Sequence, residues 1–111
     1  MIDIPEPEIS VLMPCYNAED TLPAAVESIQ NQTCRNWEFI IADDGSTDAS
    51  PAIMAGYAAH DPRIRRVHLR HGGIVAALQE GCALARAPFL ARMDADDIAE
   101  PDRLEKQHAY M

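Results

Sequence analysis

The stretch Pro88-Phe89-Leu90-Ala91-Arg92-Met93-Asp94-Ala95-Asp96-Asp97 joins an apolar run to three carboxylates within four residues. The apolar part, residues 88–93, predicts a buried β-strand, so the acids would stand at its carboxyl end, the edge at which open α/β sheets bind ligands. Clustered carboxylates repel one another unless a cation or hydrogen-bond donors compensate them. A hard divalent cation suits such a cluster. The stretch therefore predicts a cation site or, as the alternative, a solvated acidic turn that caps the next helix.

A second acidic turn has the same place relative to a strand. Asp43-Asp44-Gly45-Ser46-Thr47-Asp48 follows the apolar run of residues 37–42. Two acidic loops that each follow a strand favour the cation site over the simple helix cap. In the second loop Ser46, Thr47 or Asp48 can cap a helix that runs to about His60.

Further strands and helices alternate around these two stretches. Strands are predicted at residues 9–13, 37–42, 64–69 and 88–93, with Pro14 ending the first, and helices at residues 19–32, from about 48 to 60, from Gly72-Gly73 onward and from Pro101 onward. The alternation predicts an α/β fold with a parallel sheet and helices on both faces. Polar residues in the 64–69 run place that strand at an edge. In the third helix, Ile74, Ala77, Leu78, Gly81 and Leu84 would form the buried face.

Composition narrows the class of protein. The chain has 111 residues, of which 48% are hydrophobic, so it is long enough for one folded domain. No apolar run approaches the roughly 20 residues that cross a bilayer, and the first residues lack the features of a signal peptide. Three cysteines without metal-ligand spacing indicate reduced thiols. We therefore expect a cytoplasmic protein. A net charge of −9 excludes an electrostatic footprint for nucleic acid.

Four segments in order resemble the family 2 glycosyltransferases, whose nucleotide-binding half has the GT-A fold. They are Val11-Leu12-Met13-Pro14-Cys15-Tyr16-Asn17, Ser28-Ile29-Gln30-Asn31-Gln32-Thr33, Ile41-Ala42-Asp43-Asp44-Gly45-Ser46-Thr47-Asp48, and Met93-Asp94-Ala95-Asp96-Asp97 with the following Pro101-Asp102-Arg103-Leu104. The last two look like the family's Asp-Asp-Gly-Ser-x-Asp signature and its Asp-x-Asp metal motif. The resemblance covers residues 9–111.

The resemblance implies a Rossmann-like GT-A three-layer α/β/α sandwich with a mostly parallel sheet of about four strands. Residues 1–8 would be a mobile lead-in, and residues 9–111 the half-domain that binds a nucleotide-diphospho-sugar, with the acceptor-binding half missing. The implied activity is metal-assisted, inverting transfer of a sugar to an acceptor hydroxyl, as in the synthesis of cell-envelope polysaccharides. Mn²⁺ or Mg²⁺ is the implied cofactor. UDP is favoured as the nucleotide by the habit of the family.

The matching positions take roles by the same resemblance. Asp44 would recognise the base or ribose, and Pro14 and Tyr16 would line its pocket, Tyr16 either stacking on the base or filling the loop. Asp96 is the first choice for a direct metal ligand, and Asp94 would contact the ribose or the water shell of the metal.

Two further aspartates have supporting roles in this scheme. Asp43 would hold its own turn through backbone N–H groups, as Asp often does, and Asp97 would orient its loop.

Two positions depart from the family pattern. Leu78 stands where some members carry an arginine that points at the nucleotide, and His71 replaces an asparagine. Arg70 or Arg92 could supply the missing charge, although an arginine near a strand end is more often a surface residue. The diphosphate contacts stay open at this stage.

No catalytic residue is assigned within the chain. Inverting transfer needs a general base for the acceptor hydroxyl, which the family takes from its second half. We expect the 111 residues alone to be inactive. The acceptor would be a glycan or a lipid-linked glycan, with the protein cytoplasmic or peripheral to the inner face of a membrane, and a homodimer could cover surface left open.

Alternatives are a non-catalytic nucleotide-binding or dimerisation module of the same fold, a sugar-phosphate nucleotidyltransferase, and a receiver-type signalling domain. A nucleotidyltransferase would need a glycine-rich basic loop after the first strand, which this chain lacks. A receiver would need a lysine at a late strand end, and the one lysine, Lys106, lies in a predicted helix.

Overall fold

The computed structural model describes residues 7–70 and 72–109, so the predicted lead-in of residues 1–8 lies mostly outside the described residues, as does His71. Strands and helices alternate strictly along the chain. They are β1 (Ile9–Cys15), α1 (Leu22–Gln30), β2 (Trp37–Asp43), α2 (Ser50–His60), β3 (Ile64–His68), α3 (Ile74–Leu84), β4 (Phe89–Arg92) and α4 (Arg103–Ala109).

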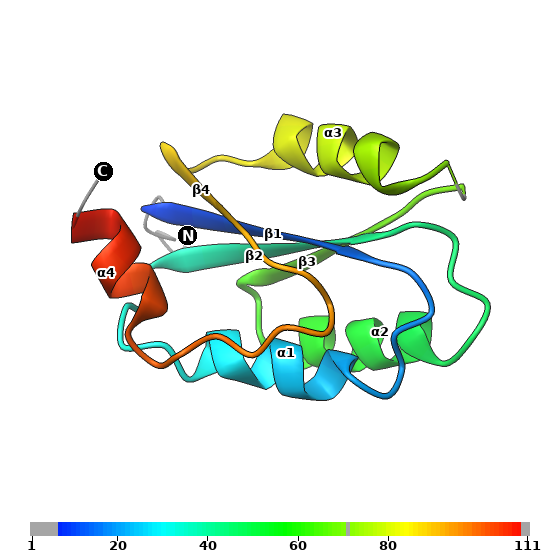
Figure 1. The fold of residues 1–111 in the computed structure, drawn as a ribbon, viewed down its shortest axis with the longest axis horizontal. Helices are drawn as coiled ribbons and strands as arrows, with labels where there is room; N and C mark the ends of the chain where they lie inside the picture. Colours follow the sequence, from blue (N-terminus) through cyan, green and yellow to red (C-terminus); the bar gives the residue numbers. More distant parts are fainter. Residues whose placement is uncertain (1–6, 71, 110–111) are drawn as a thin grey trace, which may run out of the picture.

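The four strands form one parallel sheet in the order β3-β2-β1-β4. Figure 1 shows α1 and α2 on one face of the sheet and α3 on the other, which makes the three-layer sandwich predicted from the sequence. The prediction of β3 as an edge strand is confirmed. Because all strands are parallel, the loops that leave β1, β2 and β4 emerge at the same edge.

Strand β2 is the centre of the fold, and all seven of its residues are buried. On the α1 and α2 face, Phe39 and Ile41 of β2 pack with Val11 and Met13 of β1 in one apolar cluster. Trp37, at the other end of β2, meets Phe39 edge to face and lies under the guanidinium of Arg63 at 3.8 Å. These contacts pack β2 with β1 and with the residue before β3.

The α3 face combines close packing with a buried charge. Gly81 of α3 sits directly on Leu12 of β1, where a side chain at position 81 would collide with leucine. Near the amino ends of the strands, the carboxylate of Glu38 accepts hydrogen bonds from Ser10, Arg65 and Arg86. Glu38 thereby links β1, β2, β3 and the loop before β4.

Three details differ from the expectations. Strand β4 is not buried, because it lies at the second edge of the sheet and only Ala91 of its four residues is buried. Ile74 does not belong to the buried face of α3, since it is 49% exposed at the start of that helix. The third detail concerns Pro14.

Pro14 does not end β1 but lies inside it, paired with Ala42 of β2. The carbonyl of Leu12 accepts from Met93 on the β4 side, and that of Cys15 accepts from Asp44 on the β2 side. Alternate residues of a strand bond to opposite sides. The missing N–H of Pro14 therefore faces the β4 side just beyond the end of β4, where no ladder bond is lost.

Candidate functional site

The carboxyl ends of β1, β2 and β4 surround a pocket of about 280 Å³. All four residues predicted to bind the nucleotide line this pocket together with three neighbours. The lining residues are Pro14, Cys15, Tyr16, Asp44, Gly73, Ile74 and Asp94. Residues up to 80 positions apart in the sequence thus meet at the carboxyl edge of the sheet, where α/β folds bind ligands.

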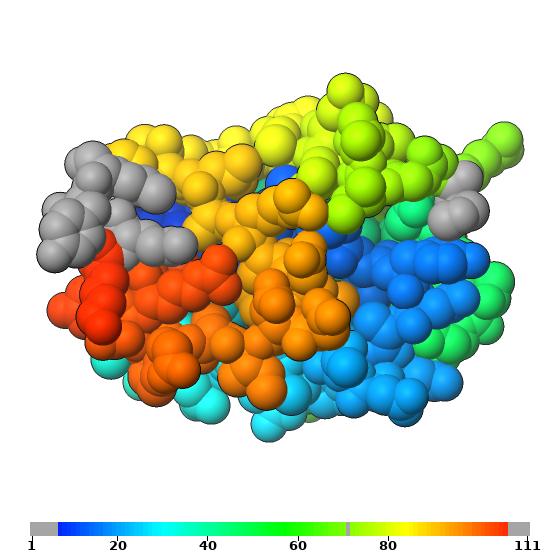
Figure 2. Space-filling view, in the orientation of Figure 1, coloured from blue at the N-terminus to red at the C-terminus, as the bar shows by residue number. Residues whose placement is uncertain are grey.

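A second pocket of about 410 Å³ adjoins the first and shares Pro14 and Tyr16 with it. It is lined by Pro14, Tyr16, Asn17, Ala18, Asp20, Thr21, Ala95 and Asp96. In Figure 2 the segment that follows β4 (orange) lies against the segment that follows β1 (blue). Tyr16 is 47% exposed between the two pockets. A larger hollow of about 570 Å³ between α1 and α2 contains none of the predicted site residues.

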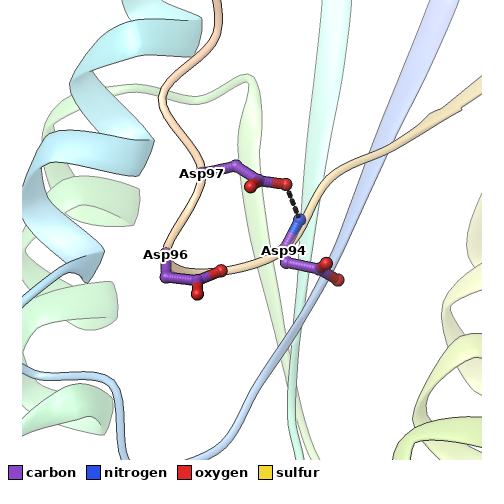
Figure 3. Close-up of side chains that lie close together, drawn as sticks. All are labelled: Asp94, Asp96 and Asp97. Carbon is purple, nitrogen blue, oxygen red and sulfur yellow. Dashed lines mark hydrogen bonds between the residues drawn. The ribbon is translucent and has the colours of Figure 1, made fainter.

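The acidic turn after β4 brings three carboxylates together. One oxygen from each of Asp94, Asp96 and Asp97 lies within 4.8 Å of the others, and all three side chains are exposed (Figure 3). Asp97 accepts a hydrogen bond from the backbone N–H of Asp94 at 2.9 Å, so its predicted role in orienting the loop is confirmed. The carboxylate of Asp96 has no hydrogen bond or ion pair with any other described residue. An exposed, all-oxygen donor set fits Mg²⁺ or Mn²⁺.

Asp44 is 4% exposed and is bound by the glycine loop before α3. One carboxylate oxygen accepts the N–H of Gly72 at 2.9 Å and the other that of Gly73 at 3.1 Å. Gly73 has φ +95°, a backbone conformation that residues with a side chain rarely adopt. Asp44 therefore holds this loop at the pocket wall. Recognition of the base by Asp44 stays a prediction.

The rest of the second acidic turn serves the fold. Asp43 accepts the N–H of Ser46 at 3.0 Å, which confirms its predicted role, and its other oxygen contacts Nδ1 of His68 at 2.9 Å. Asp48 accepts the N–H of Ser50, the first residue of α2, at 2.8 Å, but the N-cap position of that helix is Ala49, so none of the three predicted candidates occupies it. Asp44 is thus the carboxylate of this turn that lines the pocket.

Asn17 joins the two loops and was not assigned a role from the sequence. Its side-chain oxygen accepts hydrogen bonds from the backbone N–H groups of Thr47 at 2.7 Å and Asp48 at 3.3 Å. Its backbone N–H donates to the hydroxyl of Ser46 at 2.9 Å. Asn17 has φ +48°, which asparagine tolerates better than most residues. That tolerance, in a Pro-x-Tyr-Asn turn, is the signal that could have found it.

The nearby thiol and cations complete the site. Burial raises the pKa of Cys15 to about 11, so the thiol at the pocket wall stays protonated and is not a nucleophile. Of the two arginines considered for the diphosphate, Arg92 pairs with Asp94 at 3.4 Å, whereas Arg70 is exposed in the loop after β3. Leu78 is half-buried on α3. Of these two arginines, Arg92 is therefore the one that lies beside the acidic turn.

The chain matches the family described as "Glycosyl transferase family 2" over residues 10–111, and it belongs to that family. It is 42% identical to EpsE of Bacillus subtilis over 107 residues, which are 95% of this chain and 38% of EpsE. It is 38% identical to the succinoglycan biosynthesis protein ExoO of Rhizobium meliloti over 101 residues, or 90% of this chain and 28% of ExoO. The chain thus spans well under half the length of these relatives.

Solved structures show the same fold. The S. aureus protein TarS, residues 1–349 in complex with UDP-GlcNAc, superimposes with a TM-score of 0.85 at 23% identity over 93% of this chain and 30% of TarS. The mannosyltransferase PcManGT from Pyrobaculum calidifontis, in complex with GDP-Man and Mn²⁺, gives 0.82 at 24% identity over 94% of this chain and 31% of its own. The fold is that of the GT-A glycosyltransferases, and the chain is a glycosyltransferase family 2 domain.

Proposed function

We propose that these residues form the donor site of an inverting glycosyltransferase that uses a nucleotide sugar. The observation that carries the proposal is the meeting of Pro14, Tyr16, Asp44 and Asp94 around one pocket, with Asp96 lining the pocket beside it. The domain in this proposal is residues 9–111.

In this proposal Asp96 binds a divalent cation directly, and Asp94 contacts the ribose or a water of the cation. The carboxylate of Asp96, which bonds to none of residues 7–70 and 72–109, and the turn fixed by Asp97 support these roles. When bound, Mn²⁺ or Mg²⁺ supplies positive charge that stabilises the leaving nucleoside diphosphate. The chain carries a formal charge of −9, so an anionic donor needs such compensation at the contact point.

The nucleoside would lie in the pocket of about 280 Å³, against Tyr16 and Pro14, with Asp44 at its wall. The carboxylate of Asp44 would accept a hydrogen bond from an imino N–H of the base or from a ribose hydroxyl. We favour UDP. Structures of TarS hold UDP and UDP-GlcNAc, and PcManGT holds GDP-Man, so likeness of fold alone does not choose between the bases.

Transfer also needs a base that deprotonates the acceptor hydroxyl. We propose that a carboxylate outside these 111 residues does this, and that the acceptor is a glycan or lipid-linked glycan. The relative ExoO is named for succinoglycan biosynthesis, which suits an envelope polysaccharide as the product. No described helix is long and apolar enough to cross a membrane. A cytoplasmic or peripheral position at the inner face of a membrane belongs to the proposal.

Calorimetric titration of UDP into the 111-residue chain, with and without Mn²⁺, tests the donor site. We expect measurable binding that depends on the metal, stronger for UDP than for CDP, and no sugar transfer by this chain alone. Equal affinity with Mn²⁺ and with EDTA would contradict the metal-assisted site. Sugar transfer to an acceptor by the purified chain would contradict the assignment of the base to a segment outside it.

A further inference from the structure

The acidic turn lies in an irregular segment, residues 93–102, that connects β4 to α4. The segment contains no helix or strand of its own, so regular secondary structure does not pair its backbone groups. Its first residue is held by the sheet, because the N–H of Met93 donates to the carbonyl of Leu12 at 3.1 Å. Buried backbone groups beyond that point must find partners elsewhere. Figure 1 shows the segment running back across α1, and the end of that helix supplies the partners.

Ser28, in the last turns of α1, binds the segment two residues after Asp97. Its hydroxyl donates to the carbonyl of Ala25 at 2.7 Å and accepts the N–H of Ala99 at 3.0 Å. Ser28 is 9% exposed and Ala99 is 6% exposed. Without the hydroxyl, the amide of Ala99 would be buried with no acceptor.

Gln32, four residues later and 1% exposed, bonds with both ends of its side-chain amide. Its nitrogen donates to the carbonyls of Ser28 at 3.0 Å and Glu100 at 2.6 Å, and its oxygen accepts the N–H of Leu104 at 3.0 Å. The first bond caps a free carbonyl at the end of α1. The other two tie that helix end to both sides of the turn that begins α4.

We propose that Ser28 and Gln32 are positioning residues for the acidic turn. With β1 on one side and the end of α1 on the other, the backbone on each side of Asp94–Asp97 is fixed, which sets the spacing of the three carboxylates. Metal affinity depends on such spacing, because ligands that must be ordered on binding lower the net gain. The motif around Ser28 and Gln32 thus acts on a site that neither side chain touches.

This inference rests on the proposed metal site and is tested on the 111-residue chain by titration with Mn²⁺ alone, followed by water-proton relaxation. Gln32→Leu should raise the Mn²⁺ dissociation constant about tenfold, in the range found when supporting partners of ligands are lost. The matched control is Gln30→Leu. Gln30 is the last residue of α1, two positions before Gln32, but it contacts Asp61 at 3.4 Å, away from the acidic turn, so Mn²⁺ affinity should not change.

Amide hydrogen exchange, measured well below each melting temperature, provides a second readout. Gln32→Leu should speed exchange at Leu104, and the milder Ser28→Ala should speed it at Ala99, each with weaker Mn²⁺ binding. Ser28→Ala carries the test where Gln32→Leu does not fold. Parent-like Mn²⁺ affinity in a folded variant that has lost the amide protection would overturn the inference. Failure of the parent to bind Mn²⁺ would instead refute the proposed metal site.

Discussion

At the acidic turn, the three carboxylates differ in what already holds them. Asp97 binds the backbone of Asp94, and Asp94 pairs with Arg92, whereas Asp96 has no partner among residues 7–70 and 72–109. Asp96→Ala should therefore leave the melting temperature nearly unchanged. It should abolish the Mn²⁺-dependent part of UDP binding, because the direct ligand is lost. Calorimetric titration of UDP in Mn²⁺ and in EDTA measures the metal-dependent part of binding, and thermal unfolding measures the melting temperature.

The control for this change is Glu80→Ala, which removes the same charge from an exposed position on α3. Its UDP affinity should equal that of the parent protein. UDP–Mn²⁺ binding by Asp96→Ala as tight as that of the parent would show that Asp96 is not the metal ligand.

Asp44 combines a structural contact with its predicted contact to the base. In Asp44→Asn, one acceptor becomes an NH₂ group that faces the N–H of Gly72 or Gly73 and, in the complex, the imino N–H of uracil. The affinity for UDP should fall by about 1–3 kcal/mol, the penalty for a buried donor left unpaired. CDP has no imino N–H, so titrations of both nucleotides separate the roles. An equal loss for UDP and CDP would leave Asp44 with the structural role alone.

Sequence reasoning succeeded for residues whose partners are local. Asp43 and Asp97 each accept a backbone N–H three residues away, a habit of aspartate in turns. It missed Asn17 and Gln32, because their partners lie 30 and 72 residues away and are known only once the sheet is assembled. The four pocket residues were predicted by resemblance to a family, and the structure adds that they surround one pocket.

At the scale of elements, the alternation of strands and helices was enough to predict a parallel sheet covered on both faces. The position of β4 was not predictable in this way. An apolar run of six residues suits either a central strand or an edge strand whose outer side is exposed, and the pairing partner decides between them. Here β4 pairs with β1 alone among the described strands, so Leu90 and Arg92 remain exposed.

The Glu38 cluster joins three strands and should dominate the acid sensitivity of the fold. Burial alone would raise the pKa of Glu38, but hydrogen bonds from Ser10, Arg86 and Arg65 together hold that pKa below its usual 4.5. A lowered pKa in the folded state means a stabilising contribution that is complete above pH 4.5 and is lost as the pH falls through the pKa of the folded protein.

Glu38→Gln should therefore lower the free energy of unfolding at pH 7 by about 1–3 kcal/mol, since the half-exposed arginines can recover some hydration. It should also flatten the loss of stability below pH 4.5 that the parent shows. Urea unfolding at several pH values measures both effects. Exposed Glu80→Gln is the control, and a parallel acid dependence in Glu38→Gln and the parent would assign the sensitivity to other carboxylates.

For the whole molecule, the exposed apolar side chains on the α3 side favour self-association. Leu90 pairs with Ser10 on the face that α3 covers, and it is 43% exposed on an edge strand, while Val75 of α3 is 65% exposed. Open strand edges and exposed apolar side chains favour pairing with a second chain. We expect a two-fold dimer, the commonest closed assembly. Multi-angle light scattering should give twice the 12.2 kDa of the monomer.

Leu90→Glu places a charge on this face and should shift the dimer toward monomer without changing Mn²⁺-dependent UDP binding, because Leu90 lines neither pocket of the site. Ile98→Glu is the matched control. Ile98 is 72% exposed but lies in the segment that crosses α1, so a charge there should leave the dimer intact if the α3 side forms the contact. A monodisperse monomer for the parent at the highest soluble concentration would refute self-association. A dimer weakened by Ile98→Glu rather than by Leu90→Glu would place the contact on the side of the acidic turn.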